Sequence, residues 1–156
     1  MGLVSLVVVG TVLAADATPG AKREEFKQKV ENIRDERKKK IVERVDAKLA
    51  EINKRRTDAM TRHLDKMSEI LAKVKLRGGD TTAAEVAVVE ARSAVAAQAA
   101  KTYTITISTE DKLKFNVGET MKALKTDLQA VHQKIVDARK TIADVIRSVK
   151  KASPAP

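Results

Sequence analysis

Few side chains in this sequence could carry out catalysis. Only His63 and His132 titrate near neutral pH, and neither lies beside a serine or a carboxylate pair in a recognisable catalytic motif. The chain has no cysteine, which excludes a cysteine nucleophile, a thiolate metal site, a disulfide and a lipid-modified N-terminal cysteine. The sequence therefore predicts a protein that is not an enzyme and has no cofactor.

Met60, His63 and Met67 are the only group that suggests metal chemistry. They lie within two turns of one predicted helix, and thioether and imidazole ligands together suit a soft metal such as cuprous ion. The alternative is that both methionines belong to the apolar stripe of this helix and His63 lies at its border. We favour the alternative, so these residues are a weak candidate and no metal site is predicted.

Positive charge is concentrated in two short runs of the first half of the chain. The net charge of +10 favours anionic partners such as phospholipid head groups, wall polymers or nucleic acid. Nucleic acid is disfavoured, because only 2% of the residues are aromatic and no base-stacking platform is visible. The alternative is a solvated helix face with pairs such as Glu51 and Arg55. The candidate anion-binding residues are Arg37, Lys38, Lys39, Lys40, Lys54, Arg55 and Arg56.

The N-terminal residues have the pattern of an export signal. An uncharged apolar run from Leu3 to Leu13 precedes Ala15-Asp16-Ala17, which matches the small-x-small cleavage pattern. We therefore expect a signal peptide over residues 1–17, although no Lys or Arg precedes the apolar run. A retained membrane anchor is the alternative, but about 11 apolar residues are fewer than the roughly 20 that a transmembrane helix needs.

The remaining residues predict long helices that position these side chains. Charged residues make up 33% of the chain, which is typical of helices packed through narrow seams. No Pro or Gly interrupts residues 22–77, whose apolar spacing predicts one continuous helix with a period nearer an eleven-residue repeat than a heptad. Gly78-Gly79 should end this helix, and an Ala-rich helix over 82–101 should pack back against it, starting with a Thr82 to Glu85 capping box. Residues 22–40 should then overhang the bundle.

The last third predicts a connector and a final helix. Residues 102–109 alternate polar and β-branched side chains, which indicates an extended connector or, alternatively, a strand that pairs with another copy. A helix should start near residues 108–109, with a heptad seam from Met121 to Val149. The predicted fold is all-α: a long helical hairpin extended to a slim three-helix bundle or coiled coil over residues 18–151, followed by a disordered tail over 152–156.

These features together resemble secreted coiled-coil proteins predicted in candidate-phyla bacteria. The resemblance covers the whole chain, rests on no diagnostic motif, and implies an envelope location without an activity. The chain is also similar in size, charge and helicity to trimeric periplasmic holdase chaperones. It lacks the strands that begin and end their trimerisation domain, which puts a trimer in doubt.

Three functions follow as hypotheses. The first is an exported structural or adhesive protein of the cell envelope, whose helices self-associate into a homo-oligomer and whose basic face binds an anionic surface or polymer. The second is an extracytoplasmic holdase that grips unfolded proteins. The third is an enzyme or a copper-binding protein, for which the required residues are missing.

Overall fold

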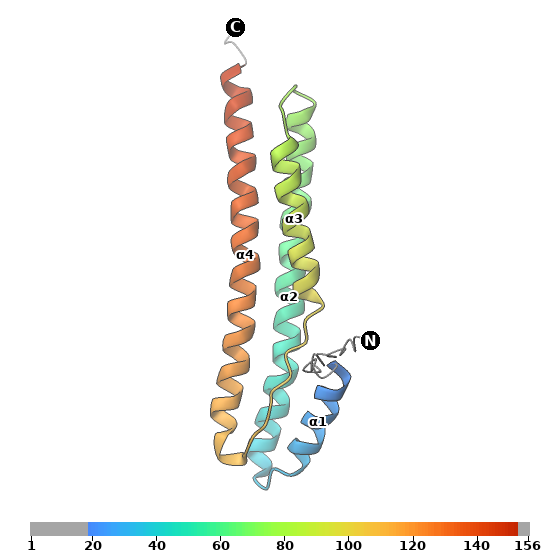
Figure 1. The fold of residues 1–156 in the computed structure, drawn as a ribbon, viewed down its shortest axis with the longest axis vertical. Helices are drawn as coiled ribbons and strands as arrows, with labels where there is room; N and C mark the ends of the chain where they lie inside the picture. The colour runs from blue at the N-terminus through green and yellow to red at the C-terminus, as the bar shows by residue number, and fades with distance from the viewer. Residues whose placement is uncertain (1–18, 153–156) are drawn as a thin grey trace, which may run out of the picture.

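Four α-helices pack against one another in the computed structural model, which describes residues 19–152 (Figure 1). The helices are α1 (Pro19–Glu31), α2 (Glu36–Lys75), α3 (Thr82–Ala99) and α4 (Leu113–Ala152), and the short 3-10 helix η1 (Glu110–Lys112) precedes α4. The all-α prediction is confirmed, and the described part of the chain contains no strand. The expected signal peptide and residues 153–156 lie outside the described residues, while Ala152, expected in the tail, ends α4.

The single helix predicted over residues 22–77 is wrong at residues 32–35, where the chain turns between α1 and α2. Asp35 has an extended backbone, and its carboxylate accepts hydrogen bonds from the backbone N–H groups of Arg37 at 2.9 Å and Lys38 at 3.2 Å. An aspartate in this position satisfies the free N–H groups of a first turn and so starts a new helix. The break therefore needs neither proline nor glycine.

Helix α1 folds back along the lower part of α2 (Figure 1). Its apolar residues are buried in a cluster that also contains residues of α2, the connector and α4. The Arg23 guanidinium forms an ion pair with the carboxylate of Asp46, which is 1% exposed. The expected overhang of residues 22–40 is thus wrong for α1, which is covered by its own chain. The cluster comprises Phe26, Val30, Ile33, Val42, Leu49, Ile105, Ile107, Leu113 and Leu124.

The buried side of α2 differs from the predicted apolar stripe. The apolar spacing of residues 22–77 predicts that Ile41 is buried, but it is 55% exposed, and Val42 beside it is only 2% exposed. The buried positions follow one another in steps of three and four, which is closer to a heptad than to the expected eleven-residue repeat. Apolar spacing alone misses this seam because three of its members are polar. The buried residues are Val42, Asp46, Leu49, Asn53, Thr57, Met60, Leu64, Met67, Leu71 and Val74.

The turn between α2 and α3 follows the glycine prediction. Gly78 has a φ of +77°, which favours glycine, and a Cβ on Gly79 would lie 2.6 Å from the side chain of Val149. The capping box expected from Thr82 to Glu85 is wrong: Thr81 is the N-cap, its side chain caps no backbone N–H group, and its hydroxyl instead donates to the carboxylate of Glu85 at 2.7 Å. The predicted seam of α4 is largely buried, except that Met121 is 49% exposed.

The connector between α3 and α4 runs extended along α2 (Figure 1). Its Ile105 and Ile107 are 0% and 4% exposed, so it packs on the helices of its own chain. Where it leaves α3, the Asn53 amide donates to the carbonyl of Gln98 at 3.0 Å and to that of Lys101 at 3.1 Å. The Gln98 amide in turn donates to Asn53 at 3.0 Å. A buried polar network thus fixes the point where the third helix ends.

Tyr103 extends this network to α4. Its hydroxyl donates to Asp127 at 2.6 Å and accepts a hydrogen bond from Gln98 at 2.7 Å. Burial and the hydrogen bond to Asp127 raise the pKa of Tyr103 to about 12. The hydrogen bonds from Lys101 and Tyr103 lower the pKa of Asp127. The neutral phenol and the ionised carboxylate are therefore the forms that hold the connector to α4.

We predict that Asn53→Ala lowers the free energy of unfolding by about 2 kcal/mol, because it leaves buried carbonyl and amide groups without partners. Urea denaturation followed by circular dichroism measures this. The matched control is Asn32→Ala at an exposed site, which should change stability by less than about 0.5 kcal/mol. Equal stabilities of the two variants would contradict the structural role of the network.

A second prediction concerns alkaline pH. Because the pKa of Tyr103 rises from 10.0 in its ordinary state to about 12 in the folded chain, its contribution to stability is present below pH 10.0 and is lost as pH rises towards 12. The stability advantage of the unmodified chain over Tyr103→Phe should therefore shrink across this range. Urea denaturation of both proteins at several pH values tests this, and a constant difference would contradict it.

Candidate functional site

The two basic runs predicted to bind anions do not form two sites. Consecutive residues of a helix point about 100° apart, so neither run can converge on a single anion. The structure also pairs one member of each run: the Lys38 ammonium lies 3.2 Å from Glu110, and that of Lys54 lies 2.7 Å from Asp58. Both runs instead contribute one arginine each, Arg37 and Arg55, to a longer pattern.

This pattern is a line of basic residues along the exposed side of α2, spaced by seven or four residues. Such steps return to nearly the same direction on a helix, and every member is exposed. The line covers most of the length of α2, about 50 Å. We define the basic stripe as Arg37, Arg44, Lys48, Arg55, Arg62, Lys66 and Lys73.

The carboxylates of α2 lie to one side of this stripe, towards α3. Asp65, for example, forms a 2.7 Å ion pair with Arg92 of α3. Only Lys48 of the stripe has a carboxylate partner among the described residues, Glu51 at 2.6 Å. The hydrogen bond from Lys48, its charge and the nearby charge of Arg55 lower the pKa of Glu51. Within residues 19–152, no other stripe residue forms an ion pair with a carboxylate. The carboxylates on this flank are those of Glu36, Glu43, Glu51, Asp58, Asp65 and Glu69.

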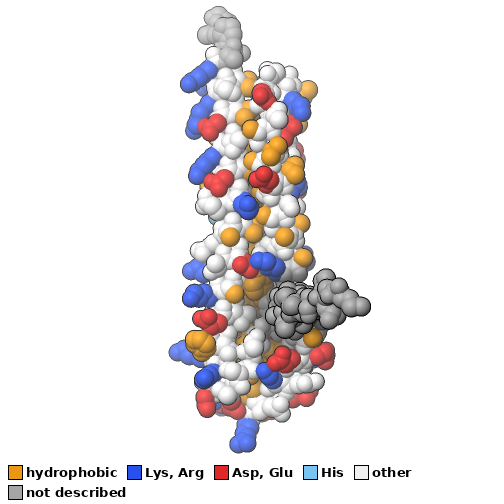
Figure 2. All heavy atoms as spheres, viewed as in Figure 1, with side chains coloured by type: hydrophobic (Ala, Val, Ile, Leu, Met, Phe, Trp, Pro, Cys, Tyr) orange, Lys and Arg blue, Asp and Glu red, His pale blue; other side chains and the backbone are white. Residues whose placement is uncertain are grey.

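Helix α4 adds basic residues beside the stripe. On α4, Asp127 pairs with Lys101 of the connector at 2.8 Å, whereas Asp137 and Asp144 are exposed and pair with Lys140 and Arg147 of the same helix. By helical projection, the flank next to α2 carries basic residues and no carboxylate. In contrast, Figure 2 shows acidic and basic side chains interspersed on the opposite side of the molecule, where α3 and the connector lie in front. We define the basic face as the basic stripe together with Lys114, Lys125, Arg139 and Lys150 of α4.

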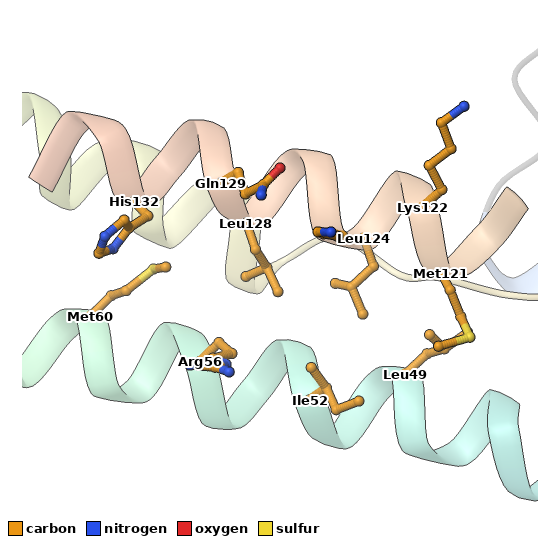
Figure 3. A pocket seen from close by; sticks show the side chains of 11 residues that line it. Leu49, Ile52, Arg56, Met60, Met121, Lys122, Leu124, Leu128, Gln129 and His132 are labelled. Carbon is orange, nitrogen blue, oxygen red and sulfur yellow. The ribbon is translucent and has the colours of Figure 1, made fainter. Parts of the chain in front are cut away.

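A groove of about 670 Å³ lies between α2 and α4, and Lys125 of the basic face is among its lining residues. Figure 3 shows Leu49, Ile52 and Met60 of α2 facing Leu124 and Leu128 of α4 across it. Arg56, one of the predicted anion-binding residues, lines the groove on the side of α2, whereas Lys122 points away from it (Figure 3). Sequence analysis missed this groove, because it depends on which residues of two distant segments face each other.

The weak metal candidate is not assembled in the structure. Met60 and Met67 are 9% and 8% exposed in the core, whereas His63 is exposed on the surface. The two thioethers thus lie on the buried side of α2, and the imidazole does not lie there with them. No group of three or more His, Asp or Glu residues within residues 19–152 is arranged to hold a metal ion.

We expect His63→Ala to leave the calorimetric response to cuprous ion unchanged under reducing conditions, because the imidazole lies outside the core that holds both thioethers. Comparing the titrations of the variant and the unmodified chain tests this. A saturable site that disappears in the variant would restore the metal hypothesis.

The fold, the basic face and the groove are the observations from which a function must be inferred. No helix within the described residues is long and apolar enough to cross a membrane. No protein-family model, no curated protein and no solved structure matches this chain.

Proposed function

We propose that this chain is an exported, non-enzymatic helical protein of the cell envelope that binds anionic surfaces or polymers through its basic face. The observation that carries the proposal is the separation of charge on α2: seven cations form one line, only Lys48 of them has an ion-pair partner among the described residues, and the carboxylates of the flank lie to one side of the line. On a solvated helix face that binds no partner, basic and acidic residues are usually mixed and form ion pairs with one another. A line of one sign is instead suited to many weak contacts with a large anionic partner.

The shape of the proposed bundle supports a large partner over a small one. We propose that α2, α3 and α4 pack as a slim three-helix bundle with coiled-coil seams, consistent with buried positions spaced by three and four residues in α2. The stripe is then nearly straight and about 50 Å long. A straight row of cations meets a membrane surface or an extended polymer along its whole length, whereas a small anion would touch only one or two of them.

Self-association into a homo-oligomer is part of this proposal. The apolar side chains of Val86, Val89 and Phe115 are 54%, 65% and 65% exposed, and contacts between copies would remove them from water. None of them belongs to the basic face, so an oligomer built through them would present several basic faces outward. Such multivalency would strengthen binding to an extended surface.

The test is co-sedimentation with vesicles of phosphatidylglycerol or with purified wall fragments at low salt. We predict binding that weakens as salt rises and that is absent from phosphatidylcholine vesicles. The triple variant Arg44→Gln, Arg55→Gln, Arg62→Gln should bind about a hundredfold more weakly, since each cation near an anionic membrane contributes about 1 kcal/mol.

A matched triple variant, Lys54→Gln, Lys140→Gln, Arg147→Gln, removes the same charge from residues that already have carboxylate partners. It should keep most of the binding of the unmodified chain. Equal losses in the two variants would mean that only net charge matters, and no binding of the unmodified chain to either surface would overturn the proposal.

A further inference from the structure

The groove between α2 and α4 has the composition of a ligand site for an apolar chain. Its floor is apolar, and its volume of about 670 Å³ falls in the range of roughly 300–1,000 Å³ that small-molecule sites have. Its length along each helix is about 16 Å, so it is elongated rather than round. The apolar lining residues are Leu49, Ile52, Met60, Met121, Leu124 and Leu128.

Every charged side chain that lines the groove is basic. Arg56 of α2 and Lys122 and Lys125 of α4 line it, as does His132 of α4, and no carboxylate does. None of these four side chains has a hydrogen-bond or ion-pair partner within residues 19–152. A second cavity of about 420 Å³ near the start of α4 lacks this property, because Glu110 and Asp111 line it. The first groove therefore combines an apolar floor with cations that are free to bind an anion.

We propose that this groove binds one long-chain fatty acid, with the acyl chain on the apolar floor and the carboxylate at Arg56 and Lys125. Charge complementarity selects an anionic head group, and the guanidinium of Arg56 suits a carboxylate because it can donate two parallel hydrogen bonds. The elongated apolar floor selects a single flexible chain over a compact ring system. This inference goes beyond binding to an envelope surface and does not depend on it.

Fluorescence of cis-parinaric acid, a fatty acid that becomes brighter on leaving water, measures this binding with the full chain. We expect saturable binding of one probe per chain at concentrations below micelle formation. The methyl ester of the same acid should bind about tenfold more weakly, because it lacks the charge that Arg56 and Lys125 recognise. The absence of saturable binding, or equal affinities for acid and ester, would overturn the inference.

Variants locate the site. Arg56→Gln with Lys125→Gln should weaken binding of the acid about tenfold and leave the ester unaffected, whereas Ile52→Glu should abolish binding of both. The matched control, Lys40→Gln with Lys134→Gln, removes the same charge outside the groove and should bind the acid as the unmodified chain does. Circular dichroism verifies that all variants fold. Equal weakening in the control and in Arg56→Gln with Lys125→Gln would assign the effect to net charge and contradict the site.

The same variants separate this inference from the proposed function. Ile52 does not belong to the basic face, so Ile52→Glu should lose the probe and still co-sediment with phosphatidylglycerol vesicles. Probe binding by an unmodified chain that binds neither vesicles nor wall fragments would overturn the proposed function and leave the groove assignment standing. Vesicle binding without probe binding would overturn the groove assignment and leave the proposed function standing.

Discussion

The orientation of α2 about its own axis, which determines the side of the helix that is buried, is the constraint on which the other features depend. One side of this helix is buried along its whole length, and polar Asp46, Asn53 and Thr57 interrupt its apolar seam. Buried polar groups need partners. Asp46 finds them in Arg23 of α1 and in the backbone N–H of Ile105, and Asn53 finds them at the end of α3. These bonds fix where α1, the connector and α3 lie against α2.

The arrangement of charged residues on the surface follows from this orientation of α2. Once the seam faces inward, residues that share one direction on the outside of α2 must be exposed together, and in this sequence they are basic. The carboxylates on the flank of α2 lie beside the stripe, and one of them, Asp65, pairs with Arg92 of α3. The groove lies on the other side of the stripe, where no third helix covers Ile52 and Arg56 within the described chain. Packing and the arrangement of charge are thus two results of the same helix orientation.

Periodicity predicted the parts of the fold that rest on apolar residues alone. The seam of α4 and the glycine turn after α2 follow from local spacing and from the positive φ of Gly78. The break at Asp35 was missed because the residues around it also suit a continuous helix, whereas its extended backbone and its side-chain hydrogen bonds are seen only in the structure. The polar seam members, the stripe and the groove were missed because each depends on which side of α2 is buried. The predicted basic runs consist of residues that are adjacent in the sequence, whereas the residues that share a surface are those that point in the same direction from the helix.

The most direct test of the proposed basic face is a lysine-acetylation footprint of the full chain, read by mass spectrometry with and without phosphatidylglycerol vesicles. Vesicles should protect Lys66, Lys73 and Lys125, which lie on the basic face, and should leave Lys54, Lys101 and Lys140, which have carboxylate partners elsewhere, as reactive as before. Uniform protection of all six lysines, or protection confined to the second group, would contradict binding through this face.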